Sequence, residues 1–230
     1  LEQVADRSDA PLAFYLLAAQ AGHAMGDDAA AEKYLHKARK SAPSNTSDLA
    51  VGLAQAQLQL DKGQLEQALA TLTRAKSLSS SHPVTVKLLA QTYERLYDWE
   101  QLRKLLPELK RSQALPAEQL GKLERKVYAS LIGQTTSASS GAVAQLEKTW
   151  RLLPKELAGD PEMEAVYARQ LIAAGAPAVA EKFLRKALRK SWDDRLVHCY
   201  GLAPGEDLAQ QLQLAEGWLK DRPTNPEPLL

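Results

Sequence analysis

The chain has 230 residues and a mass of 25.2 kDa, with 45% hydrophobic and 25% charged residues, which is typical of a soluble globular protein and not of a disordered one. Its 29 basic and 28 acidic residues leave a formal net charge of +1, too small to indicate a nucleic-acid-binding surface. Aromatic residues make up only 6% of the chain, and Ala, Leu, Gln, Glu, Lys and Arg dominate, so we expect an all-α protein.

Cysteine content and hydropathy exclude two further classes. The single cysteine, Cys199, excludes an internal disulfide and any multi-cysteine metal site. No stretch approaches the roughly 18 to 20 uninterrupted apolar residues that span a bilayer. Because the chain begins at Leu1 without an initiator Met or a signal segment, we expect it to be the excised soluble part of a longer protein.

Three regular helical hairpins are predicted in the first half of the chain, at residues 10–43, 48–80 and 83–112. In each, apolar residues recur at helical spacing on both sides of a short polar turn. Gly63 supplies the positive φ that the second turn requires, and Pro83 is a suitable first residue for the third hairpin.

The second half is less regular. Residues 115–155 predict an irregular hairpin, because residues 133–141 form a Gly-, Ser- and Thr-rich loop longer than a repeat normally carries. A regular hairpin returns at 161–192 and is followed by C-terminal helices over 194–220. Residues 223–230 carry three prolines and predict the start of a truncated further repeat.

Small residues repeat in one register along the hairpins. Thirty-seven residues separate Ala31 from Ala68, and thirty-four separate Ala68 from Leu102. The corresponding positions are Ala19, Ala31 and Ala38, then Ala56, Ala68 and Ala75, then Ala90, Leu102 and Leu109, and finally Ala168, Ala180 and Ala187. This pattern resembles that of tetratricopeptide (TPR) repeats. The resemblance implies a right-handed superhelix of about five to six antiparallel helical hairpins, an α-solenoid forming one domain over residues 1–230.

Three longer sequence strings make the resemblance more specific. They are YLLAAQAGHAMGDDAAAEKYLHKA from Tyr15 to Ala38, YDWEQLRKLLPEL from Tyr97 to Leu109, and WDDRLVHCYG from Trp192 to Gly201. In this order and spacing they resemble the TPR region of the proteobacterial HemY family. That resemblance implies a role in a late stage of protohaem biosynthesis. It also implies an inner-membrane protein in full length, with two transmembrane helices ahead of repeats that face the cytoplasm.

A groove is the first place to look for function, because the first helices of TPR hairpins line the inner surface of the superhelix. Side-chain amides and basic groups in such a groove can bind the backbone and carboxylates of an extended peptide. Exposed polar residues without a role would give the same pattern. Projecting the register predicts that the groove residues are Leu16, Gln20, His23, Leu53, Gln57, Lys87, Gln91, Glu94, Arg95 and Arg169.

The histidines raise an alternative in which His23 or His198 is an axial haem ligand, which would require an enclosed apolar pocket. His198 and Cys199 are adjacent, but successive helical residues point about 100° apart and do not converge on one ion. No metal site and no catalytic constellation is predicted. The run Glu181–Lys190 is predicted to present a solvated basic face, with contact to anionic lipid or an acidic partner as the alternative.

We therefore expect a non-enzymatic scaffold without a resident cofactor, which binds late haem-biosynthesis enzymes such as ferrochelatase. The alternatives are a haem or porphyrin carrier and a TPR adaptor unrelated to haem. Nucleic acid is not an expected partner, and membrane contact is expected only through segments outside this chain. Exposed terminal repeats favour a dimer, because they leave apolar surface uncovered.

Overall fold

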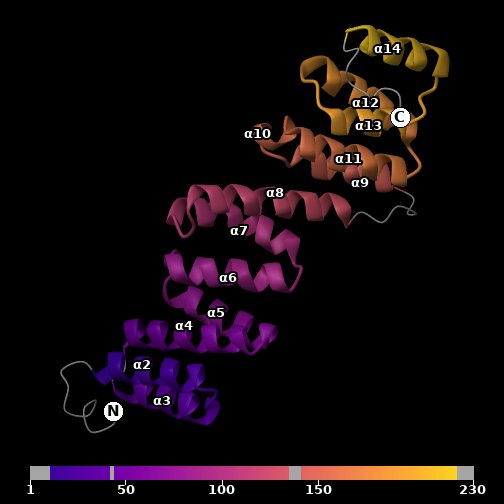
Figure 1. Ribbon diagram of the computed structural model, residues 1–230. Coiled ribbons are helices and arrows are strands. Elements are labelled where there is room, and N and C mark those ends of the chain that lie inside the picture. The colour runs from indigo at the N-terminus through magenta and orange to yellow at the C-terminus, as the bar shows by residue number, and fades with distance from the viewer. Residues whose placement is uncertain (1–10, 42–43, 135–140, 222–230) are drawn as a thin grey trace. The chain divides into compact units, whose positions relative to one another are not determined.

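The computed structural model describes residues 11–41, 44–134 and 141–221, and every regular element within those ranges is a helix (Figure 1). The all-α prediction is confirmed. The chain forms two compact units, one ending at Leu120 and one beginning at Gly121, and each is described by itself. The predicted repeat at 223–230 lies outside the described residues.

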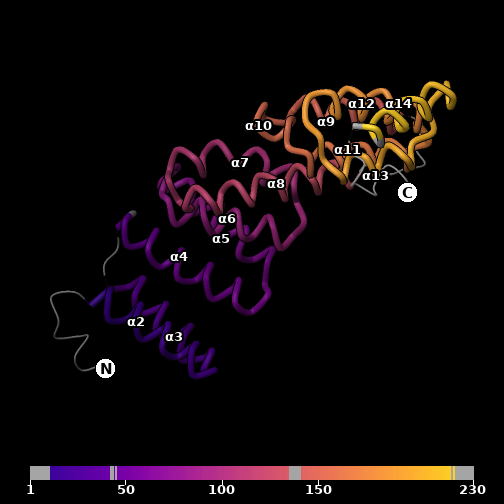
Figure 2. Tube along the Cα trace, turned by 45° about the horizontal axis from the view of Figure 1, so that its top comes forward, coloured from indigo at the N-terminus to yellow at the C-terminus, as the bar shows by residue number. Residues whose placement is uncertain are grey.

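The N-terminal unit is a series of three antiparallel hairpins, which follow one another in Figures 1 and 2. Its helices are α2 (Pro11–Ala24) with α3 (Asp28–Ser41), α4 (Asn45–Asp61) with α5 (Leu65–Leu78), and α6 (Pro83–Arg95) with α7 (Trp99–Ser112). These pairs correspond to the predicted hairpins at 10–43, 48–80 and 83–112. The first helices also pack in series, α2 against α4 and α4 against α6.

The turns of these hairpins follow from residues with special backbone geometry. Gly26 and Gly63 have φ of 77° and 73°, which glycine adopts without steric cost. In the third turn Tyr97 takes this role with φ of 56°, and its ring packs edge-on against Trp99 at 5.9 Å between centroids. Asp98 then begins α7 by accepting a hydrogen bond of 3.1 Å from the backbone N–H of Gln101.

The repeated small residues lie where the helices approach closely. All of the register positions found in the sequence, from Ala19 to Ala187, are buried. A Cβ added at Gly22 would lie 3.1 Å from the backbone N of Ala31, which shows how tightly α2 approaches the start of α3. The repeated pattern therefore marks the seams between paired helices.

The C-terminal unit contains most of α8 (Ala117–Gly133), followed by α9 (Ala142–Arg151) and the short α10 (Lys155–Ala158). The predicted hairpin at 161–192 is the pair α11 (Pro161–Ala173) and α12 (Pro177–Lys190). The helix α13 (Asp194–Gly201) packs against both, and α14 (Leu208–Asp221) ends the described chain. The irregularity predicted at 115–155 corresponds to α9 packing against α11, and residues 135–140 of the predicted loop lie outside the described ranges.

Aromatic side chains fill the space between α9, α11 and α12. The ring of Trp150 stacks on Tyr167 with centroids 4.4 Å apart, and Phe183 packs edge-on against both rings at 5.3 and 5.0 Å. Such contacts add to the free energy gained by burying the rings. Burial raises the pKa of Tyr167 to about 12, with the nearby Glu147 acting in the same direction.

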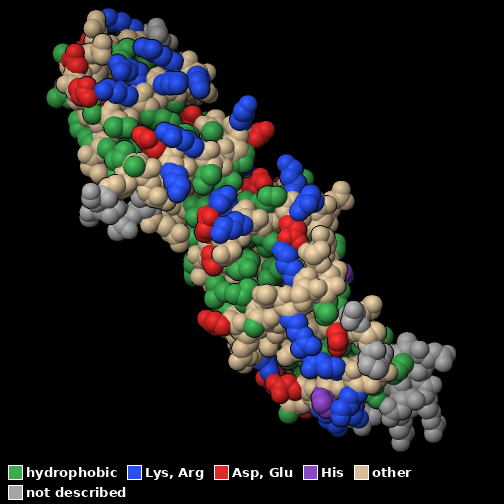
Figure 3. Space-filling model, turned by 180° about the vertical axis from the view of Figure 1, so that it is seen from behind, with side chains coloured by type: hydrophobic (Ala, Val, Ile, Leu, Met, Phe, Trp, Pro, Cys, Tyr) green, Lys and Arg blue, Asp and Glu red, His purple; other side chains and the backbone are tan. Residues whose placement is uncertain are grey.

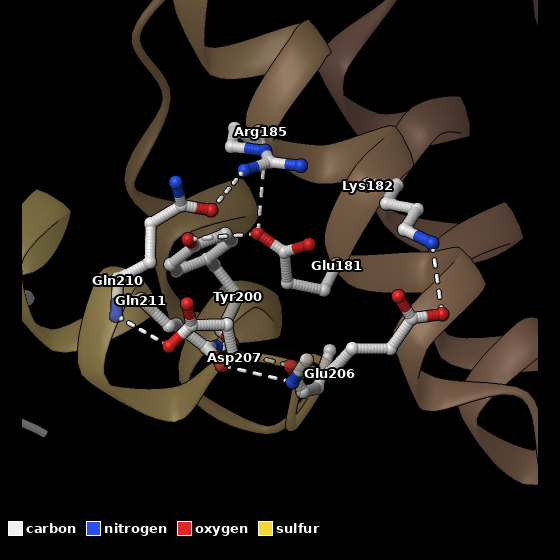
Figure 4. Close-up of polar contacts among 10 residues, drawn as sticks. Glu181, Lys182, Arg185, Tyr200, Glu206, Asp207, Gln210 and Gln211 are labelled. Atoms are coloured by element: carbon white, nitrogen blue, oxygen red, sulfur yellow. Dashed lines mark hydrogen bonds and ion pairs between the residues drawn. The ribbon is translucent and has the colours of Figure 1, made fainter.

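A buried polar network joins α12 to α13 (Figure 4). Oε1 of Glu181 accepts a hydrogen bond of 3.0 Å from the Tyr200 hydroxyl and lies 3.4 Å from Nε of Arg185. Arg185 in turn donates to Gln210 of α14 at 3.0 Å. Glu181 is only 5% exposed, so it does not belong to the solvated basic side predicted for the run up to Lys190. The rest of α12 still carries exposed Lys182, Lys186, Arg189 and Lys190, and Figure 3 shows basic side chains gathered on one face of this unit.

Candidate partner-binding groove

The first helices of the N-terminal unit line an open surface hollow of about 460 Å³. It is lined by Leu16 and Gln20 from α2, by Thr46, Leu49, Ala50, Leu53, Ala54 and Gln57 from α4, and by His82, Val84 and Leu88 at and after the start of α6. A second hollow of about 190 Å³ shares Gln20, Ala54 and Gln57 with the first and adds His23 and Asp61. We call the two together the first-helix groove.

Most of the groove surface is apolar. Neither Lys, Arg, Asp nor Glu is among the residues that line the larger hollow. Val84 is 46% exposed and Leu53 is partly exposed, so apolar side chains are accessible on the groove wall. Surfaces of this kind, where apolar walls meet a few polar groups, are suited to binding part of another protein.

Polar side chains meet at the end of the groove that contains His23 and Asp61. Asp61 accepts a hydrogen bond of 2.8 Å from the Gln57 amide, and its other carboxylate oxygen lies 3.4 Å from Nε2 of His23. Nδ1 of His23 lies 3.4 Å from Oδ1 of Asp28. A hydrogen bond from Lys62, whose Nζ lies 3.1 Å from Asp28, is the main reason why the pKa of the Asp28 carboxyl falls below its usual value. This end of the groove is therefore acidic and ordered by hydrogen bonds.

The structure brings half of the predicted groove residues together. Leu16, Gln20, His23, Leu53 and Gln57 all line the first-helix groove.

The predicted residues of α6 do not line it. Lys87 and Gln91 are exposed and Glu94 is partly exposed, but none of them borders either hollow. Arg95 donates a hydrogen bond to the backbone carbonyl of Leu60 and so connects α6 to the C-terminal end of α4. Arg169 is exposed on α11 and belongs to the C-terminal unit.

Several groove residues were missed by the register projection, among them Asp61, His82, Val84 and Leu88. A signal for two of them was present, because Val84 and Leu88 are four residues apart and share a helix face with Gln91. The position of His82 could not be read from periodicity, since it precedes α6. Its Nδ1 atom is buried and has no hydrogen-bond partner among the described residues.

The second candidate haem ligand has a different environment. His198 is exposed on α13, whereas the adjacent Cys199 is 1% exposed and its burial raises the pKa of the thiol. Within the described ranges, no group of three or more His, Cys, Asp and Glu side chains is placed to hold a metal ion. Nor do those ranges contain a helix that combines the length and apolar character needed to cross a membrane.

Comparison with known proteins shows which proteins the chain resembles. No family model matches the chain. It is 25% identical over 193 residues to Protein HemY of Escherichia coli strain K12 and, equally, to Protein HemY of Shigella flexneri. The chain is similar to HemY. The alignment covers 84% of this chain and 48% of the relatives, so the HemY-like chain spans about half the length of the curated relatives it matches.

Solved structures give a more distant likeness. A thermophilic TPR protein of Thermus thermophilus is 22% identical with a TM-score of 0.42, covering 84% of this chain and 98% of that one. The TPR2AB domain of yeast Sti1, in a complex with pHSP90, is 17% identical with a TM-score of 0.40 and covers 96% and 94% of the two chains. The assignment to an α-solenoid of TPR-like hairpins depends on the helix pairing and the buried register described above.

Proposed function

We propose that this HemY-like chain is a non-catalytic scaffold that binds protein partners in its first-helix groove. The observation that carries the proposal is the largely apolar wall made by three successive first helices, whose one lining carboxylate, Asp61, lies at one end. A partner segment laid along this wall would bury Leu53 and Val84, which are accessible to solvent, and would contact Leu88 at the base of the hollow. Burial of accessible apolar surface is the main favourable contribution to association.

The similarity to HemY supports a proposal about the biological setting. We propose that the full-length protein is held at the bacterial inner membrane with this region on the cytoplasmic side, and that it coordinates enzymes of late haem biosynthesis. Ferrochelatase is the partner proposed first. An arrangement of this kind would keep poorly soluble porphyrin intermediates close to the enzymes that use them.

The test is a pull-down of purified late-pathway enzymes, including ferrochelatase, with the wild-type chain and with Leu53→Glu. The substitution places a charge in the middle of the apolar wall, and we expect it to abolish retention. Leu17→Glu is the matched control, because Leu17 is 62% exposed on α2 and does not line the groove. The scaffold proposal fails if no enzyme is retained, or if both variants behave like the wild type.

Self-association is a separate proposal for the other end of the chain. Leu208 and Leu212 of α14 lie four residues apart and are 63% and 61% exposed, so a second copy could bury them together. Sedimentation of the wild-type chain and of the double variant Leu208→Gln with Leu212→Gln tests this. A monomer at all concentrations would rule it out.

A further inference from the structure

The first-helix groove changes chemical character along α4. Thr46, Ala50, Leu53, Gln57 and Asp61 follow at spacings of three or four residues and therefore lie on one face of the helix. All of them line the groove. The wall is apolar around Ala50 and Leu53, becomes amide-bearing at Gln57, and ends in the Asp61 carboxylate.

The charges at this end are unbalanced. Asp61 is the only Asp, Glu, Lys or Arg among the residues that line the two hollows. Lys62, which lies outside the lining, is 3.1 Å from Asp28 and 3.7 Å from Glu32, so two carboxylates already oppose its charge. Arg95, the other cation at this end of α4, lies outside the lining and donates to the Leu60 carbonyl. The Asp61 side chain is 42% exposed and accessible to a ligand.

We propose that the segment bound in this groove carries a Lys or Arg side chain that pairs with Asp61, next to an apolar side chain seated on Leu53, Val84 and Leu88. This inference rests on the proposed function and names the chemistry of the partner. The Gln57 amide holds one oxygen of Asp61 at 2.8 Å, which fixes the carboxylate before the ligand arrives. A fixed acceptor loses less conformational entropy when it forms an ion pair.

The spacing between the two subsites follows from helix geometry. Eight residues separate Leu53 from Asp61 on α4, which at a rise of 1.5 Å per residue corresponds to about 12 Å. An extended segment covers that distance in about four residues. The bound segment is therefore expected to have its cation about four positions from its apolar anchor.

An acidic segment fits this groove poorly. Lys87, a predicted groove cation, does not line either hollow, and Arg95 is hydrogen-bonded to the Leu60 carbonyl. A ligand carboxylate at the polar end would meet Asp61 with no lining cation to offset the repulsion. Repulsion between the ligand carboxylate and Asp61 would therefore weaken binding of an acidic segment.

The experiment measures binding of three blocked, fluorescein-labelled peptides by anisotropy. Each carries a Leu triplet flanked on both sides, about four positions away, by Lys, Glu or Ser, so that the result does not depend on the direction of binding. We expect the Lys peptide to bind about tenfold more tightly than the Glu peptide, because an attraction is gained and a repulsion avoided. The Ser peptide should fall between them.

Variants assign the preference to one residue. Asp61→Asn should reduce the difference between the Lys and Glu peptides, and Asp61→Lys should reverse it. Asp48→Asn is the matched control on the same helix, since Asp48 lines a separate hollow with Arg39 and Arg74, and it should leave the preference unchanged.

The outcomes separate the two proposals. If the three peptides bind equally and Leu53→Glu abolishes binding, the groove function stands and the charge inference is wrong. A preference for Glu, or a preference for Lys that survives in Asp61→Lys, also overturns the inference. If none of the peptides binds, both the groove function and the charge inference are overturned.

Discussion

The Tyr200 hydroxyl and the Glu181 carboxylate form a buried hydrogen bond of 3.0 Å that joins α13 to α12. Burial raises the pKa of the Tyr200 phenol, and its bond to the carboxylate acts in the same direction, so the hydroxyl remains a donor at physiological pH. Arg185 approaches the same oxygen of Glu181 at 3.4 Å. This buried oxygen therefore has two donors, which offset the solvation that the carboxyl group loses on burial.

Tyr200→Phe should therefore destabilise the C-terminal unit. The substitution keeps the ring but removes one of the two donors to Glu181, and a buried acceptor that loses a hydrogen-bond donor costs about 1 to 3 kcal/mol. Urea unfolding monitored by circular dichroism measures the change. Tyr167→Phe is the control, because Tyr167 is also buried but packs against Trp150 and Phe183, and an equal loss in both variants would contradict the explanation.

Two glycines in the N-terminal unit should respond to alanine in opposite ways. A Cβ at Gly52 would meet only the Cβ of Ala75 at 4.0 Å, so Gly52→Ala should stabilise α4 by about 0.5 to 1 kcal/mol through a lower entropy of the unfolded chain. At Gly22 the Cβ would lie 3.1 Å from the Ala31 nitrogen and 3.3 Å from the Asp27 carbonyl oxygen. Gly22→Ala should therefore destabilise, and thermal unfolding of the two variants tests the contrast.

Arg95 was predicted to contact a ligand, but its hydrogen bond to the Leu60 carbonyl suggests a structural role. Arg95→Met keeps much of the aliphatic stem and removes the donor. We expect a loss of stability of about 1 kcal/mol, as is usual for one hydrogen bond to a partly exposed group. Peptide affinity in the anisotropy assay should stay within about twofold of the wild type. A large loss of affinity with unchanged stability would return Arg95 to the binding site.

Periodicity predicts the helices of this chain well because their pairing is local. Ala31 and Ala38 face a helix only a few residues away, and the same small residues recur at Ala68 and Ala75, so the buried seams can be found by spacing alone. The hairpins at 10–43, 48–80, 83–112 and 161–192 follow from that signal. The chain forms two compact units. Its organisation as a single domain stays a prediction.

Contacts between side chains distant in sequence could not be predicted. Glu181 lies in a strongly charged run, and nothing in that run reveals its burial or its hydrogen bond with Tyr200, nineteen residues away. The groove residues contributed by α6 were likewise not predicted. The α2 and α4 residues were predicted because their spacing repeats, whereas the α6 wall is formed by Val84 and Leu88 at the start of the helix and not by the polar face from Lys87 to Arg95.

Haem binding through His23 is testable and is not expected. Its two ring nitrogens lie 3.4 Å from carboxylate oxygens of Asp28 and Asp61, in a polar and partly exposed setting, whereas an axial ligand needs an apolar enclosed pocket. Titration of haem into the wild type and into His23→Ala should give the same Soret spectrum. His198→Ala serves as the comparison for the second candidate. A Soret shift lost in either variant would support the carrier alternative.

Glu164 should make the stability of the C-terminal unit depend on pH. Burial raises the pKa of this carboxyl, and Asp160 and Asp193 add to the effect while Lys190 opposes it. The folded state therefore keeps the proton to a higher pH than the unfolded chain, whose Glu residues titrate near about 4.3. Between the two pKa values the folded state binds more protons, so the free energy of unfolding falls as pH rises through this window.

Glu164→Gln removes this titration. We expect the variant to match the wild type at a pH below the window and to be more stable than the wild type above it, because the wild type then carries a negative charge on a buried side chain. Urea unfolding at about pH 4 and pH 8 measures the difference. Glu162→Gln, at an exposed position on the same helix, should differ in stability from the wild type by the same amount at both pH values. A Glu164→Gln variant that loses stability at the higher pH would mean that the ionised carboxylate stabilises the fold through Lys190.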